Sequence, residues 1–150
     1  MVEKDYATFV IRIALGLYIL VWGIAKFVQQ DFWLQMFPMI YWGLVVGATV
    51  LAVFGIVEIV LAAMLILGWK VTIAAWIGFL IQLSTTVALI GRIAAPYVMV
   101  EADPVKPNIV LFGTVVILGA WLALALRGKT GPYAIEKYSW DLCKKRAVLV

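Results

Sequence analysis

The chain has 150 residues, of which 66% are hydrophobic and 13% are charged, and its mean hydropathy is +1.09. A soluble domain of this length leaves much of its surface in water and could not bury so many apolar residues. The composition therefore excludes a cytosolic enzyme, a disordered tail and a nucleic-acid-binding domain. It predicts an integral membrane protein. The net charge of +4 then bears on the orientation of the chain in the membrane.

Four stretches of the sequence are apolar over roughly 20 residues, the length that crosses a bilayer as a helix. They cover about residues 8–26, 41–67, 71–90 and 109–126. Only residues 68–70 connect the second stretch to the third, which predicts an antiparallel hairpin. The first connection, 27–40, is rich in aromatic residues and is predicted to be a loop along the lipid headgroups. The sequence thus predicts an all-α fold, an integral membrane four-helix bundle that forms one domain over residues 1–150.

The remaining segments are more polar. Residues 91–108 contain three prolines and two acidic residues and are predicted to form an ordered, non-helical loop. Residues 127–150 combine aromatic side chains with the basic run 144–146, which is typical of an amphipathic tail on anionic lipid. Nine of the 12 lysines and arginines fall on the side of the two termini. Because positive charge is retained on the inner side, both termini are predicted to be cytoplasmic.

Small residues mark two predicted helix contacts. One stripe of the first helix carries Arg12, Gly16, Ile19, Gly23 and Lys26. In the second stretch, Gly43 and Gly47 form a GxxxG pair. Glycines on one face let another helix approach closely, so these four are predicted to be packing positions. Two such faces also leave self-association of the chain open.

Glu58 is the charged residue that most needs an explanation, because a charge at the centre of a span costs roughly 2.5–3.5 kcal/mol. We predict Arg12 as its partner, since both fall in the cytoplasmic half of the bundle. The pair is either a structural contact that fixes helix register or part of a polar pocket that protonates or hydrogen-bonds a ligand headgroup. Gln82 lies on the polar face of the third helix, and Trp22 either packs in the core or lines such a pocket. Lys26 is predicted to be an interfacial anchor.

The residue types that the sequence lacks limit its chemistry. It has no histidine, which excludes histidine ligation of haem, copper or zinc and histidine-based hydrolase triads. Its one cysteine, Cys143, excludes an internal disulfide and a cluster held by cysteines of this chain alone. We therefore expect no metal site. Any redox role would depend on a diffusible cofactor such as a quinone, or on a group carried by a partner.

Several segments together resemble the DoxX-like family of membrane proteins. They are the first-helix motifs at 12–16 and 22–27, the segment 55–58 with its glutamate, the Lys-Pro-Asn sequence at 106–108 and the closing Tyr-Ser-Trp-Asp at 138–141. Trp22 stands where many relatives have a histidine, so no role of that histidine carries over. The family positions that this chain matches are Arg12, Lys26, Glu58 and Asn108.

The resemblance implies a four-helix integral subunit associated with oxidoreductases, in a group that includes the membrane subunit of a thiosulfate:quinone oxidoreductase. It also implies larger redox subunits as partners, a quinone as the ligand and no redox centre in this chain. We accordingly expect a multi-pass protein of a prokaryotic cell membrane. Two alternatives stay open: a purely structural assembly subunit of a large membrane complex, and a small homo-oligomeric transporter.

Overall fold

A computed structural model describes residues 6–90, 93, 113–127 and 134–135 of the chain. Over these residues the fold is all-helical, with α1 (Tyr6–Val28), α2 (Gln30–Ile40), α3 (Ala48–Leu67), α4 (Val71–Ala88) and α6 (Gly113–Arg127). By length and composition α1, α3 and α4 can each cross a membrane, which indicates a membrane protein. Most of the predicted loop 91–108, including Asn108, and most of the predicted tail 127–150 lie outside the described residues.

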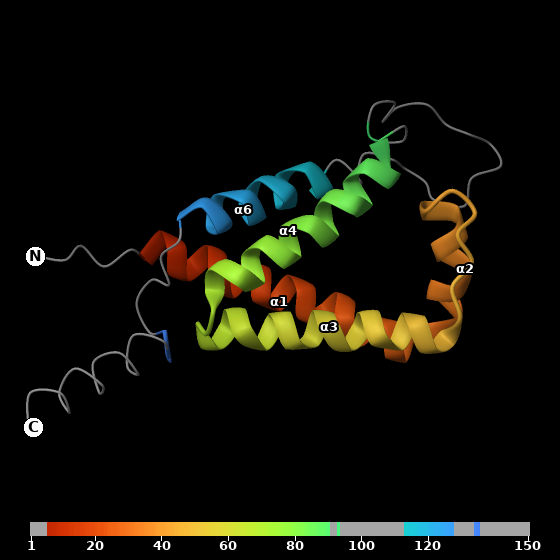
Figure 1. Cartoon of the computed structure of the whole chain (residues 1–150), viewed down its shortest axis with the longest axis horizontal. Helices are drawn as coiled ribbons and strands as arrows, with labels where there is room; N and C mark the ends of the chain where they lie inside the picture. The colour runs from red at the N-terminus through yellow and green to blue at the C-terminus, as the bar shows by residue number, and fades with distance from the viewer. Residues whose placement is uncertain (1–5, 91–92, 94–112, 128–133, 136–150) are drawn as a thin grey trace, which may run out of the picture.

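The long helices form two pairs (Figure 1). Helix α1 runs antiparallel to α3, and α4 runs antiparallel to α6. The two pairs lie close together near the turn between α3 and α4 and diverge toward the opposite end. Helix α2 lies across that end, transverse to α1 and α3. The arrangement therefore has one tightly packed end and one end that α2 closes.

The apolar core follows this division. The larger cluster fills the region where the two pairs meet, and its members include Leu15, Leu61, Val71 and Trp121. A smaller cluster of Trp33, Phe37 and Leu51 joins α2 to the start of α3. The outer faces of the long helices carry many large exposed apolar side chains, as expected of surfaces that contact lipid.

Glycines set the distance between α1 and α3. A Cβ atom at Gly23 would lie 3.1 Å from the carbonyl oxygen of Gly55, and one at Gly16 would lie 2.8 Å from the Ile66 side chain. The two backbones therefore approach more closely than larger side chains at these positions would allow, as small residues permit in membrane helices. The antiparallel register places the first half of α1 opposite the end of α3.

Two predicted features near α2 are wrong. Residues 30–40, predicted to be loop, form a helix that buries Trp33 and Phe37. The next helix begins at Ala48 rather than near residue 41. Trp42 and Gly43, with φ of 49° and 87°, end the preceding helical stretch, and residues 44–47 are not helical.

The GxxxG pair accordingly lies outside the helix to which the sequence assigned it. Gly43 belongs to the turn and Gly47 caps the N-terminus of α3. A Cβ atom at either position would meet nothing within 4 Å. The prediction that Gly43 and Gly47 pack against another helix is therefore wrong.

The connection between α3 and α4 is as short as the sequence predicts. Gly68 has a φ of 72°, and its N–H donates to the carbonyl of Leu65 at 3.1 Å. Such a left-handed residue after the last turn is a common helix end that favours glycine. Lys70 is also left-handed, with a φ of 49°, so the chain reverses within three residues.

A close contact between α4 and α6 gives the first prediction. A Cβ atom at Gly78 would collide with ring atoms of Trp121. We expect Gly78→Ala to lower the stability of the purified protein by about 1–3 kcal/mol, the typical cost of overpacking a core. Thermal unfolding in detergent would measure it.

Gly119, in α6, supplies the matched control, because a Cβ atom there would meet nothing within 4 Å. Gly119→Ala should leave stability unchanged or raise it slightly through higher helix propensity. Equal melting temperatures for the two variants would contradict the described packing of α4 on α6.

Candidate ligand-binding site

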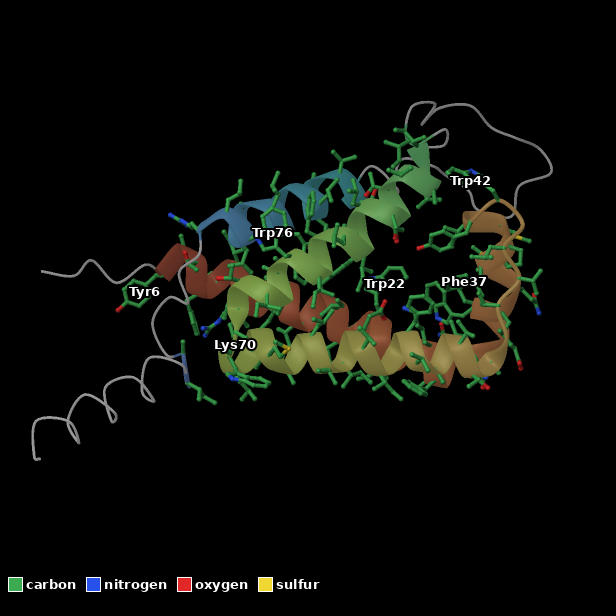
Figure 2. The ribbon with its side chains drawn as sticks, in the orientation of Figure 1. Tyr6, Trp22, Phe37, Trp42, Lys70 and Trp76 are labelled. Atoms are coloured by element: carbon green, nitrogen blue, oxygen red, sulfur yellow. The ribbon has the colours of Figure 1, made fainter. Side chains whose placement is uncertain are left out.

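A cavity of about 740 Å³ lies where the two helix pairs diverge, and residues of all five helices line it. Most of its lining side chains are apolar. Figure 2 shows Trp22 and Phe37 in this region, bounded by α4, by α1 and α3, and by α2, whereas Tyr6 and Lys70 lie at the other end of the molecule. Its volume falls within the range of roughly 300–1,000 Å³ that is usual for small-molecule pockets.

A buried ion pair forms part of the cavity wall. The Nζ atom of Lys26 donates to Oε2 of Glu58 at 2.6 Å, and both side chains are buried. The same Nζ lies 3.5 Å from the carbonyl oxygen of Trp22 and 5.1 Å from the centre of the Trp33 ring. An isolated charge is costly in an apolar medium, so the ion pair lowers the free-energy cost of burying each of the two charges.

The predicted pairing of Glu58 with Arg12 is wrong. In the antiparallel register of α1 and α3, the Glu58 side chain lies against Gly23, one helical turn from Lys26. Since α3 begins at Ala48, Glu58 lies at the middle of its helix rather than in one half of it. Lys26, predicted to be an interfacial anchor, is instead the buried partner of Glu58.

Arg12 lies at the opposite end of the α1–α3 pair and does not line the cavity. Its guanidinium group is buried, 5.4 Å from the centre of the Phe9 ring, a distance suited to a cation–π contact. A Cβ atom at Gly68 would collide with Nη1 of Arg12 and would lie 2.7 Å from Ala134. Arg12 therefore belongs to the packing around the α3–α4 turn.

Aromatic rings form the wall beside the ion pair. The rings of Trp22 and Trp33 meet edge to face with centroids 5.2 Å apart, and Tyr18 lies 6.0 Å from Trp22. Phe37 stacks on Tyr41 at 4.9 Å. All five line the cavity, which therefore offers flat apolar surfaces on which a ring can pack.

Hydrogen bonds fix the wall on the side of α4. Gln82 is buried and lines the cavity, and its Nε2 atom donates to the carbonyl of Thr114 in α6 at 3.4 Å. The hydroxyl groups of Tyr41 and Thr85 are 2.9 Å apart. Because the Thr85 hydroxyl donates to the carbonyl of Ile81 at 3.2 Å, Tyr41 is the donor between them. These bonds connect α4 to α6 and to the end of α2.

The structure thus brings three of the predicted ligand-binding residues, Glu58, Trp22 and Gln82, to one cavity. Sequence analysis missed Trp33, Phe37 and Tyr41. Their spacing of four residues is that of one helix face and could have revealed α2. The aromatic composition suggested an interfacial loop instead.

Comparisons of the chain with family models, curated proteins and solved structures find no match. The chemistry of the cavity is therefore defined by its own side chains. Among the described residues no group of three or more histidine, cysteine, aspartate or glutamate residues could hold a metal ion. What the cavity offers is a hydrogen-bonded ammonium and carboxylate within a mostly apolar enclosure that also contains aromatic rings and a few neutral polar side chains.

The ion pair gives the second prediction. Lys26→Met or Glu58→Leu alone leaves an unpaired buried charge, and we expect either change to cost about 3–5 kcal/mol of stability. The double variant Lys26→Met, Glu58→Leu removes both charges and should recover most of that loss, because an apolar pair of similar size is tolerated in the interior.

Unfolding of the four proteins in the same detergent measures this coupling. A double variant whose loss equals the sum of the two single losses would show that the side chains do not interact.

Proposed function

We propose that this chain is an integral membrane subunit that binds a quinone in the cavity beside Lys26 and Glu58. It would act within an electron-transfer oxidoreductase complex whose redox centres lie on other subunits. The observation that carries the proposal is a cavity of about 740 Å³ among apolar helices, with aromatic walls and one buried ion pair. A quinone has the matching features: a flat ring, carbonyl oxygens and an apolar chain.

The donors at the ion pair suit a quinone carbonyl. The Lys26 ammonium has three N–H groups, of which one bonds Glu58 and a second faces the carbonyl oxygen of Trp22. The third can donate to a ligand in the cavity. As electrons enter a quinone from a partner, negative charge develops on its oxygens, and a fixed ammonium stabilises that charge. The Lys26–Glu58 pair is also a proton-holding group beside those oxygens.

The sequence adds two supports. Arg12, Lys26 and Glu58 match the positions at which the chain resembles DoxX-like subunits of oxidoreductases. The distribution of lysine and arginine favours cytoplasmic termini, and the resemblance implies a prokaryotic cell membrane. In that orientation α2 and the end of the bundle that holds the cavity lie toward the outer side of the membrane.

Binding of decylubiquinone to the protein in lipid nanodiscs tests the ligand. Quenching of tryptophan fluorescence should saturate for the wild-type protein, and the folded double variant Lys26→Met, Glu58→Leu should bind at least about tenfold more weakly, since it lacks the charged hydrogen-bonding groups. Gly119→Ala, away from the cavity, should bind like the wild type. Absence of saturable quenching in the wild type would overturn the proposal, as would equal affinity of the double variant.

Purification of the native protein in mild detergent tests the complex. We expect haem, flavin or iron–sulfur subunits to copurify in fixed ratio, together with quinone in the extracted lipid, because this chain would need a partner to supply electrons. Mass spectrometry of proteins and lipids measures both. A homo-oligomer without redox partners would contradict the subunit role and favour the transporter alternative.

A further inference from the structure

The wall of the cavity becomes more exposed from the ion pair toward Phe54 and Ser84. Phe54, on α3, lines the cavity and is 42% exposed, whereas Glu58, one turn along the same face, is 6% exposed. Ser84 lines the cavity from α4 and is likewise exposed. A lining residue that is itself exposed marks the rim of an opening, so Phe54 and Ser84 are rim residues.

The two rim residues lie at the same level of the α3–α4 hairpin. Phe54 lies 13 residues before Leu67, the last residue of α3. Ser84 lies 13 residues after Val71, the first residue of α4. At 1.5 Å per residue both are about 20 Å from the turn, where the two helices have diverged (Figure 1). Since α3 is about 30 Å long, the thickness of the hydrocarbon core, an opening at this level faces acyl chains rather than water.

The opening beside Phe54 leads to the ion pair by a short path. Phe54 and Glu58 differ by four residues, about 6 Å along α3 and about 40° around it. Val21 of α1 also lines the cavity and is 67% exposed, but it lies about 140° around its helix from Lys26. Figure 2 shows Trp22, a cavity-lining residue of α1, between the ribbons of α3 and α4. The side between α3 and α4 is therefore the one from which a ligand reaches Lys26 and Glu58.

We propose that the cavity opens sideways into the bilayer between Phe54 and Ser84, so that a quinone head enters from the lipid while its apolar tail stays there. The inference rests on the proposed function for the ligand and adds its class: quinones whose long tails keep them dissolved in the membrane. Because the tail lies outside the cavity, the cavity volume does not limit its length.

A decylubiquinone analogue with a diazirine on its alkyl tail tests the route in lipid nanodiscs. Light attaches the tail to the residues beside it, and mass spectrometry of the peptides locates the attachment. We expect crosslinks at Phe54 and Ser84 that an excess of decylubiquinone removes. Crosslinks at Val21 that are removed in the same way, without any at Phe54 or Ser84, would place the opening beside α1 and overturn the proposal.

The rate of binding supplies a second readout. Ser84→Phe adds a ring at the rim, and the matched variant Val87→Phe adds one at an exposed position of α4 that does not belong to the described cavity lining. Stopped-flow quenching of tryptophan fluorescence follows decylubiquinone. We expect Ser84→Phe to slow association about tenfold, because the ring narrows the route, and Val87→Phe to match the wild type. Equal association rates for all three proteins would contradict the route.

The outcomes separate this inference from the proposed function. Saturable binding of decylubiquinone without competed crosslinks at Phe54 or Ser84 overturns the lateral route alone. Absence of saturable binding overturns the proposed function and, with it, the route.

Discussion

The ion pair between Lys26 and Glu58 is the constraint on which the rest of the structure depends. In an apolar medium neither charge is acceptable alone, so α1 and α3 have to pack in the one register that joins them. That register in turn requires glycine at positions 23 and 55, because a Cβ atom on either residue would lie 3.1 Å from the carbonyl oxygen of the other. Charge pairing and close glycine packing therefore specify the same helix arrangement.

The cavity follows from where this pair lies. The main core fills the end near the α3–α4 turn and stops before the ion pair is reached. Beyond that point α4 and α6 diverge from α1 and α3 (Figure 1). Aromatic side chains of α2 line the space that remains without filling it. The opposite charges of Lys26 and Glu58 thus compensate each other, and both side chains still border a mostly apolar cavity. This arrangement suits a ligand with a polar head and an apolar body.

The sequence was sufficient for the helices but not for their register. Apolar length alone predicts α1, α3 and α4, because lipid requires about 20 such residues for each span. The partner of Glu58 could not be predicted, since hydropathy does not reveal that residues 41–47 are non-helical and that α3 begins only at Ala48. Trp33 was missed for a related reason: aromatic residues near a membrane surface look alike whether they face lipid or line a cavity.

The three-residue turn between α3 and α4 also constrains how the chain enters a bilayer during synthesis. A connection of three residues cannot bridge the distance between an α3 that is inserted in the bilayer and an α4 that is still outside it. The two helices therefore have to insert together as one hairpin. Helix α1 precedes them, and Lys26 is two residues from its end. Because an ammonium without a partner is costly in lipid, we expect α1 to join the hairpin and the Lys26–Glu58 pair to become buried in one step.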